Sequence, residues 1–284
     1  MEHKTNSILA FIPQNKEGEL VLKEALYFQK MLGMRIFILN VIKAPSFFSK
    51  RFQAEKMRIL KDEALQSLNG FVKNVIQEEI PKNIILNIKI GDVVSTLINE
   101  SKRGGYDFII VDKSRSSFKG PLHWNKFDNF ISQSHCPVLT VNKDFPVREI
   151  KKIIIPIDIS QTTKKRLLWA TLFAKKFNAK IQIVSALNVN IDETKSLAFK
   201  NAKNIKHLLW DQEIECDVII LKVHQQKKHK AILEYIDKEK PELVIIRTHQ
   251  ESIFSETNIG KFVSEIVHGC NMPVFTVNYS QKQY

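Results

Sequence analysis

The segment from Arg247 to Lys261, RTHQESIFSETNIGK, has residue types that could bind an anion between a strand and a helix. Four apolar residues, LVII, precede it, and the amphipathic run FVSEIVHG follows it. Loops in this position cradle phosphates with glycine backbone and with the free N–H groups at the start of the helix. This loop has a single glycine, Gly260, and begins with an arginine. Its pattern therefore fits either a nucleotide site or a former one.

The same kind of segment occurs twice, because the chain repeats itself in order. Three pairs of segments correspond: SILAFIPQN (7–15) with KIIIPIDIS (152–160), YDFIIVDKS (106–114) with PELVIIRTH (241–249), and CPVLTVN (136–142) with MPVFTVN (272–278). Internal similarity in a fixed order indicates two copies of one domain. The join, KDFPVREIKK, holds a proline and charges, as short linkers do. We predict one domain over residues 1–143 and a second over residues 150–284.

Strand and helix patterns alternate within each copy. The run KIIIPI is almost continuously apolar and is typical of a strand buried on both faces. Residues 162–177 and 192–212 carry helical stripes, the first marked by Leu167, Leu168, Leu172 and Phe173. Strands separated by helices pair in parallel through right-handed crossovers. The expected fold is α/β: two tandem doubly wound domains, each a five-stranded parallel sheet with helices on both faces.

In such sheets, ligands bind beyond the carboxyl ends of the strands, where the strand order reverses. In the second copy, PIDIS follows the first strand, and the loop that begins at Arg247 follows the fourth. Asp158 could accept hydrogen bonds from a ribose or an adenine amino group. It could equally form an N-cap-like turn with Ser160 and Thr162.

The segments IIIPIDIS, GDVVSTLINES, LVIIRTHQ, CPVLTV and MPVFTV resemble the universal stress protein family in its tandem form, over nearly the whole chain. Many members of that family bind ATP through a loop of the form G-x-x-G, nine residues, then G-[ST]. Related families that activate substrates with ATP carry S-G-G-x-D after the first strand. Here the corresponding places read PQNKEGE and DISQTTK, so that chemistry is not expected.

The loop pattern maps onto the second copy without a gap but with altered residues. Arg247 and Gln250 replace the first two glycines, Gly260 is kept, and Lys261 replaces the small hydroxyl residue. Arg247 and Lys261 could replace backbone contacts with charge-assisted ones, or fill an empty cleft and face solvent. The resemblance implies a cofactor-binding set of nine residues: Pro156, Asp158, Ala186, Arg247, Thr248, Gln250, Gly260, Lys261 and Phe262.

The first copy departs further from the pattern. Its four equivalent positions hold Asp112, Arg115, Asn125 and Lys126, and Pro13 stands where the second copy has Asp158. A side chain at a glycine position occupies space that the phosphates need, and the Asp112 carboxylate would repel a phosphate. We therefore predict a degenerate nucleotide loop in the first domain and a partly retained one in the second.

No other group of residues has the spacing of a catalytic or metal site. The eight histidines lack HxxxH or HExxH spacing, and are expected on the surface or in loops. Ser114 and Ser252 have no glycine-flanked nucleophile elbow. Cys136 is expected to be buried, and the three tryptophans are expected in the core. Residues 45–60, with exposed-looking phenylalanines, are expected to begin a helix packed on the sheet, the alternative being a lid or partner surface.

Composition and charge limit the partners and the compartment that the sequence predicts. The 284 residues contain 43 basic and 30 acidic side chains, a net charge of +13. The densest basic cluster, KVHQQKKHK, has no interleaved aromatic residue, so a nucleic-acid partner is not favoured. No apolar run or leader predicts a membrane partner, and three scattered cysteines fit a reducing cytoplasm.

These features together predict a cytoplasmic, non-enzymatic stress-response regulatory or binding protein with weakened or lost nucleotide binding, no metal, and a possible protein partner. The alternative is a slowly hydrolysing ATP sensor that uses the second domain, with ATP or another adenine nucleotide as its cofactor. Single-domain members of the family pair through their final strands. We therefore expect the two copies to form an intramolecular pseudo-dimer, with Pro137–Val141 beside Pro273–Val277.

Overall fold

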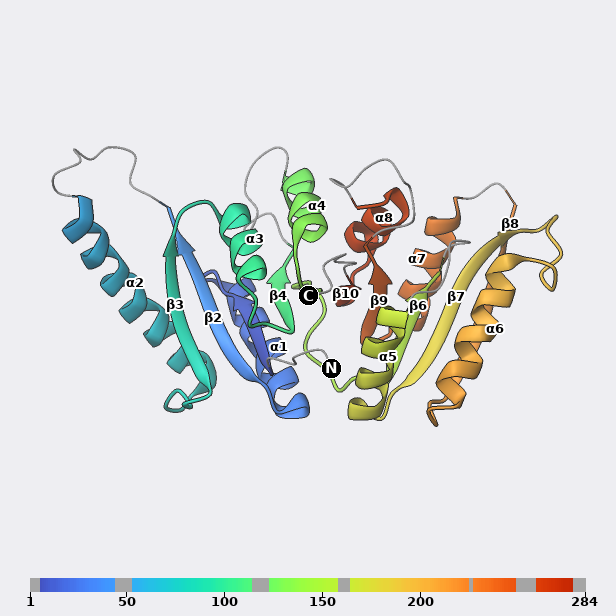
Figure 1. The fold of residues 1–284 in the computed structure, drawn as a ribbon, viewed down its shortest axis with the longest axis horizontal. Coiled ribbons are helices and arrows are strands. Elements are labelled where there is room, and N and C mark those ends of the chain that lie inside the picture. Colours follow the sequence, from blue (N-terminus) through green and yellow to red (C-terminus); the bar gives the residue numbers. More distant parts are fainter. Residues whose placement is uncertain are drawn as a thin grey trace. The chain divides into compact units, whose positions relative to one another are not determined.

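The chain divides into two compact units, Met1–Val147 and Arg148–Tyr284. The computed structural model describes residues 6–43, 53–113, 123–157, 164–224, 227–248 and 259–277. Each unit alternates strands and helices in the same order (Figure 1). Among the described helices, none combines the length and apolarity that crossing a bilayer requires.

The first unit contains a parallel sheet in the order β3-β2-β1-β4-β5. Its elements are β1 Ser7–Phe11, α1 Lys16–Leu32, β2 Arg35–Ile42, α2 Gln53–Ile76, β3 Ile84–Ile90, α3 Val93–Arg103, β4 Phe108–Asp112, α4 His123–Gln133 and β5 Val138–Val141. Strands β1, β4 and β5 are buried along their whole length, because helices cover both faces of the sheet.

The second unit repeats this topology, with its strands in the order β10-β9-β6-β7-β8, again all parallel. Its elements are β6 Lys152–Pro156, α5 Lys164–Phe177, β7 Lys180–Asn188, α6 Leu197–Trp210, β8 Cys216–Val223, α7 Lys228–Glu239, β9 Leu243–Arg247, α8 Lys261–Gly269 and β10 Val274–Val277. The predicted fold class is confirmed.

Helices pack in pairs on the two faces of each sheet. In the second unit α5 contacts α6, and α7 contacts α8 (Figure 1). Right-handed crossovers explain this pairing. The connections from β6 to β7 and from β7 to β8 run in one direction along the sheet and place α5 and α6 on one face. The connections from β8 to β9 and from β9 to β10 run in the other direction and place α7 and α8 on the opposite face. The core of this unit includes the Phe173 and Phe275 rings, 5.0 Å apart and edge to face, with Trp169 5.1 Å from Phe275.

Two sequence-based expectations about α6 were wrong. The helix begins at Leu197 rather than at residue 192, because the Ser196 hydroxyl accepts a hydrogen bond from the Phe199 N–H and caps it. Trp210, expected in the core, is 62% exposed. The apolar stripe predicted for α5 was also partly wrong, because Phe173 is fully buried as expected but Leu168 is 59% exposed. Trp169 is half-buried and packs against the Phe173 and Phe275 rings, and the Trp124 side chain lies outside the described residues.

The segment expected to begin a helix on the sheet also differs from the expectation. Residues 45–52 lie outside the described part of the chain, and α2 begins at Gln53. In its first turns Ala54, Glu55 and Lys56 are exposed, and Ile59 is 47% exposed. The start of α2 therefore packs loosely, and firm burial begins at Leu68.

Candidate functional site

The strand order reverses at one place in each sheet, and this place defines the candidate site. In the second unit the reversal lies between β6 and β9, which pair with Ile153 opposite Leu243 and Ile154 opposite Val244. In the first unit it lies between β1 and β4. At such a reversal the two flanking connections leave on opposite faces, so a crevice opens beyond the carboxyl ends of the strands.

The described members of the predicted nine-residue set lie at this edge of the second unit. Pro156 ends β6, and Arg247 ends the neighbouring β9. Ala186 lies on β7, just beyond Val184, the residue that pairs with Pro156. Thr248 follows β9, and Gly260, Lys261 and Phe262 form the start of α8. Asp158 and Gln250 lie outside the described residues.

Backbone hydrogen bonds close the loop between β9 and α8 at its base. The Thr248 N–H donates to the Val277 carbonyl at 3.1 Å, and the Gly260 N–H donates to the Thr248 carbonyl at 3.3 Å. The Thr248 hydroxyl lies 3.3 Å from the same Val277 oxygen, and the residue is fully buried. The base of the loop is therefore an anchored part of the sheet.

The start of α8 has the electrostatics of an anion-binding helix terminus. Gly260 occupies the N-cap position and has no side chain to cap the helix, and the first turn of α8 contains no acidic residue. Lys261 is exposed beside it, and Arg247 is half-buried at the end of β9. Free N–H groups, the helix dipole and two cations favour negative charge here. The φ of Gly260 is −57°, so the backbone at this position does not require glycine.

The corresponding edge of the first unit is filled by its own residues. Asp112 ends β4 with 1% of its surface exposed, and Lys113 is 6% exposed. The Asn15 side chain caps α1 by accepting from the Gly18 N–H at 3.0 Å. A Cβ on Gly18 would stand 1.7 Å from the Pro13 carbonyl oxygen, so the helix start and the loop after β1 are in direct contact.

Two side-chain contacts at this edge were missed by sequence reasoning. The Ser67 hydroxyl, on α2, donates to the Gln14 side chain at 2.6 Å. The Asn40 amide, 7% exposed on β2, donates to the Ile12 carbonyl at 2.7 Å. A polar residue inside the apolar run FILNVI was the available signal for Asn40. Of the residues that fill the first-copy loop pattern, Arg115 and the Asn125 side chain lie outside the described part.

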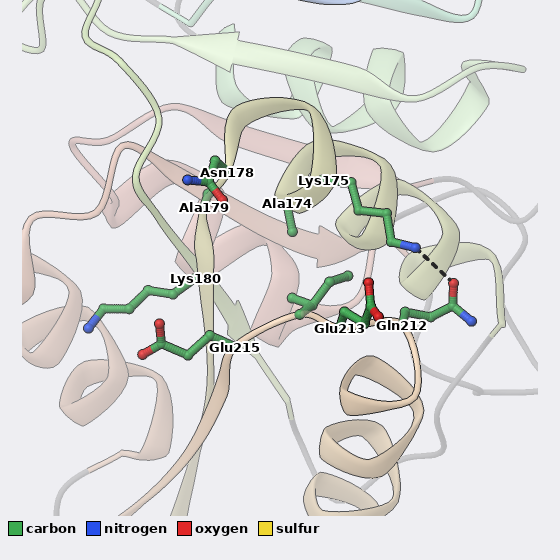
Figure 2. A pocket seen from close by; sticks show the side chains of 9 residues that line it. Ala174, Lys175, Asn178, Ala179, Lys180, Gln212, Glu213 and Glu215 are labelled. Atoms are coloured by element: carbon green, nitrogen blue, oxygen red, sulfur yellow. Dashed lines mark hydrogen bonds between the residues drawn. The ribbon is translucent and has the colours of Figure 1, made fainter.

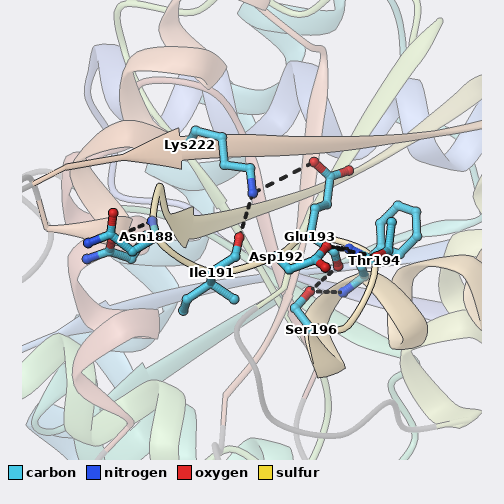
Figure 3. A network of polar contacts seen from close by, with 9 residues as sticks. Asn188, Ile191, Asp192, Glu193, Thr194, Ser196 and Lys222 are labelled. Carbon is cyan, nitrogen blue, oxygen red and sulfur yellow. Dashed lines mark hydrogen bonds and ion pairs between the residues drawn. The ribbon is translucent and has the colours of Figure 1, made fainter.

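A polar network orders the loop after β7, at the same edge of the second unit (Figure 3). The Asp192 carboxylate accepts from the Thr194 N–H at 3.0 Å and from its hydroxyl at 2.8 Å. These hydrogen bonds hold the pKa of Asp192 below its usual value. Lys222 donates to the Ile191 carbonyl at 2.9 Å and lies 4.0 Å from Glu193. Contacts within the loop and from Lys222 of β8 therefore hold this loop.

Histidines and cysteines in the described residues do not form a reactive centre. His229, on α7, lies 3.6 Å from Glu265 on α8, and its side chain is 13% exposed, so it is more buried than expected. Cys136 is buried, as expected, and burial raises its pKa to about 12, as it does that of Cys216. Both thiols are protonated at neutral pH. Within the described ranges no cluster of His, Cys, Asp and Glu could hold a metal ion.

A shallow pocket of about 360 Å³ lies at the opposite end of the second unit, beside the amino ends of β7 and β8 (Figure 2). It is bordered by the turns that end α5 and α6, where Asn178 and Glu213 adopt positive φ. Lys175 donates to the Gln212 side chain at 3.1 Å across one side. Ligands of doubly wound sheets bind at the carboxyl edge, so this pocket is not the candidate site.

Comparison with known proteins identifies the second unit. Residues 149–278 match the model of the Universal stress protein family and form a domain of that family. A universal stress protein from Archaeoglobus fulgidus is similar in fold at 17% identity, with 99% of this chain and 98% of that chain covered and a TM-score of 0.68. A functionally unknown protein from Pseudomonas aeruginosa is similar at 16% identity, over 96% of this chain and 92% of that chain, with a TM-score of 0.61.

A universal stress protein from Archaeoglobus fulgidus in complex with dAMP matches 46% of this chain and 99% of its own length, at 15% identity and a TM-score of 0.37. No curated protein matches the sequence. The family match at residues 149–278 confirms the predicted family for the second half of the chain, and the full-length structural matches show the fold of the first half.

Proposed function

We propose that the protein is a non-enzymatic stress-response regulator of the universal stress protein type that binds an adenine nucleotide weakly, and only in its second unit. One contrast carries this proposal. Where the fourth strand of each sheet ends, at the reversal of strand order, the second unit has Arg247 and the first has Asp112.

In the second unit, a phosphate would be held by the start of α8 together with Arg247 and Lys261. The helix terminus supplies N–H groups and a favourable dipole, and the cations supply charge-assisted contacts. Weak binding is expected because the glycines that let backbone approach phosphates in the family loop are replaced here by larger side chains. A family domain at residues 149–278 supports the adenine nucleotide as the ligand class.

In the first unit, two features argue against a nucleotide. The Asp112 carboxylate lies at the strand end with 1% exposure, where it would repel a phosphate. The loop after β1 also contacts the start of α1 directly, at Pro13 and Gly18, and Asn15 already caps that helix. The first unit is therefore a structural or partner-binding copy.

A regulatory role requires that the site bind a nucleotide, without a group that hydrolyses it. The alternative function, slow ATP hydrolysis in the second unit, needs a group that positions water beside the γ-phosphate. Asp158 and His249 belong to the loops of the site, and both lie outside the described residues.

Isothermal titration of the full chain with ATP tests the proposal. The expected stoichiometry is one nucleotide per chain, with binding weakened by Arg247→Gln and unchanged by Arg58→Gln, which alters an exposed arginine of α2 in the first unit. Two nucleotides per chain, or equal affinity of the Arg247→Gln variant, would contradict it. Steady release of inorganic phosphate from ATP, lost in Arg247→Gln, would instead favour the hydrolytic alternative.

A further inference from the structure

Helices α5 and α6 differ from the other helices in charge. Five basic residues lie in α5 and three in α6, and neither helix contains an aspartate or glutamate. Each of the other described helices carries at least one acidic residue. In the first unit the equivalent helix to α6 is α2, which offsets its basic residues with Glu55, Asp62 and Glu63.

The described lysines of these two helices have no carboxylate partner within the described ranges. Lys175 bonds to the neutral Gln212, and Lys176 and Lys200 are exposed. Lys203 and Lys206 extend over aromatic rings, 5.1 Å from the centre of Phe199 and 5.4 Å from that of Trp210. Their positive charge is therefore not neutralised locally, whereas lysines such as Lys23 and Lys152 are paired with glutamates.

Large apolar side chains are exposed among these lysines. Leu168 of α5 is 59% exposed, and on α6 Leu197 is 62%, Leu208 is 53% and Trp210 is 62% exposed. These four are half of the large hydrophobic residues that are exposed in the described part of the chain. Burying a large apolar side chain is favourable, so a cluster of exposed ones on one side of a unit indicates an interaction surface.

The two helices lie side by side on one face of the second unit's sheet (Figure 1). Their inner stripes, which include Phe173 and Ile205, are fully buried. We define the α5/α6 face as the outward surface formed by Leu168, Lys175, Lys176, Leu197, Lys200, Lys203, Lys206, Leu208 and Trp210. This face is cationic and apolar at once.

We propose that the α5/α6 face docks on the surface of an anionic phospholipid membrane. Clusters of basic residues on an amphipathic helix are attracted to anionic headgroups, and exposed tryptophan and leucine side chains enter the boundary between headgroups and acyl chains. The lysine stems lie along the apolar surface while their ammonium groups reach the phosphates. A nucleic acid would satisfy the lysines but leave the leucines in water.

This docking is independent of the nucleotide proposal and differs from the sequence-based expectation of no membrane partner. That expectation considered only spanning segments, and the docking requires none. Both helices keep their packing on the sheet, so the protein would bind the membrane as a folded unit and at its surface.

Co-sedimentation with vesicles tests the proposal on the full chain. Vesicles of phosphatidylcholine mixed with phosphatidylserine should retain the protein at low salt, and vesicles of phosphatidylcholine alone should not. Replacing Lys200, Lys203 and Lys206 together by glutamine should lower the partition coefficient on the order of 100-fold, given the contribution of each lysine near an anionic surface. The double variant Leu208→Ser and Trp210→Ser should also lower the partition coefficient. This loss should exceed the loss that raised salt causes in the wild type.

The matched control is the triple variant Lys30→Gln, Lys61→Gln and Lys102→Gln, which removes the same charge from exposed lysines of the first unit. It should bind like the wild type. Equal losses in both triple variants would overturn the proposal, because net charge alone would then explain the binding. Absence of vesicle binding at low salt would overturn it, as would binding to a single-stranded RNA oligonucleotide that depends on the three lysines while vesicle binding does not.

Discussion

Asp112 and Arg247 occupy the same position in the two units and carry opposite charges. Asp112 ends β4 opposite Val141 of β5, and Arg247 ends β9 opposite Val277 of β10. The neighbouring strands β5 and β10 differ at a single position, VLTV against VFTV, and the two pairs of strands have the same register. At this strand end the two units therefore differ in the sign of one charge.

The first prediction exchanges this charge. Arg247→Asp, which gives the second unit the residue of the first, should weaken ATP binding about 10-fold to 100-fold, because a charge-assisted contact is replaced by repulsion. The measurement is calorimetric titration at low ionic strength. The control is Asp237→Asn, which changes a charged residue on α7 away from the candidate site and should leave the affinity unchanged. Unchanged binding in Arg247→Asp would place the nucleotide elsewhere.

The second prediction concerns the contact between the loop after β1 and helix α1. An added Cβ at Gly18 would lie 1.7 Å from the Pro13 carbonyl oxygen. This oxygen belongs to the backbone, which cannot move aside as the end of a flexible side chain can. Gly18→Ala should therefore lower the free energy of unfolding by about 3 kcal/mol or more. Urea denaturation of the purified full chain measures this.

Gly70 provides the matched comparison, because it lies inside α2 with no atom near the position of an added Cβ. Gly70→Ala should raise the free energy of unfolding by about 0.5 to 1 kcal/mol, as expected for a solvent-exposed helix interior. If both alanine variants had similar stability, the close approach at Gly18 would be wrong.

The strands were predictable from sequence because parallel strands buried on both faces are apolar throughout. KIIIPI became β6, and the repeated ending of each copy became β5 and β10. Topology then followed from alternation with helices and from the handedness of crossovers. The edge that holds Pro156, Arg247 and Gly260 was predictable for the same reason, because strand order decides which strand ends are neighbours.

The side-chain contacts at the carboxyl edge of the first unit's sheet were not predictable from the sequence. Ser67 and Gln14 are far apart in the chain, and their hydrogen bond depends on how α2 lies over the loop after β1. The exposure of Trp210 was missed because apolar neighbours in sequence do not determine which side of a helix faces the sheet. The start predicted for α6 was too early because Asp192 and Ser196 hydrogen-bond to nearby backbone and favour turns and caps over helix interior.

The expected pairing of the two final strands stays a prediction, and it is the third that can be tested. Cysteines in place of Thr140 and Thr276, in a variant that lacks the three native cysteines, should form a disulfide within one chain under mild oxidation. Non-reducing electrophoresis and mass spectrometry of linked peptides would detect it. The same oxidation of a Lys30→Cys and Lys240→Cys variant serves as the control for random encounter. Cross-links that form only between chains would contradict the intramolecular pseudo-dimer.

The last prediction concerns Glu24, a carboxyl buried on α1. Only 5% of the residue is exposed, and burial raises its pKa from 4.5 to about 7. Because the folded-state pKa lies above the unfolded value, the protonated form is favoured in the folded protein. The contribution of Glu24 to the free energy of unfolding is therefore greatest below about pH 4.5 and is lost as the pH rises through 7, by about 3 kcal/mol in total.

Glu24→Gln keeps the size of the side chain and removes its titration. The variant should match the wild type near pH 4.5 and exceed its free energy of unfolding by up to about 3 kcal/mol near pH 8, as measured by urea denaturation across that range. Glu63→Gln, at an exposed position of α2, should follow the wild-type profile. A constant difference between Glu24→Gln and the wild type at all pH values would mean that Glu24 stays ionised in the folded protein, against the desolvation that its burial imposes.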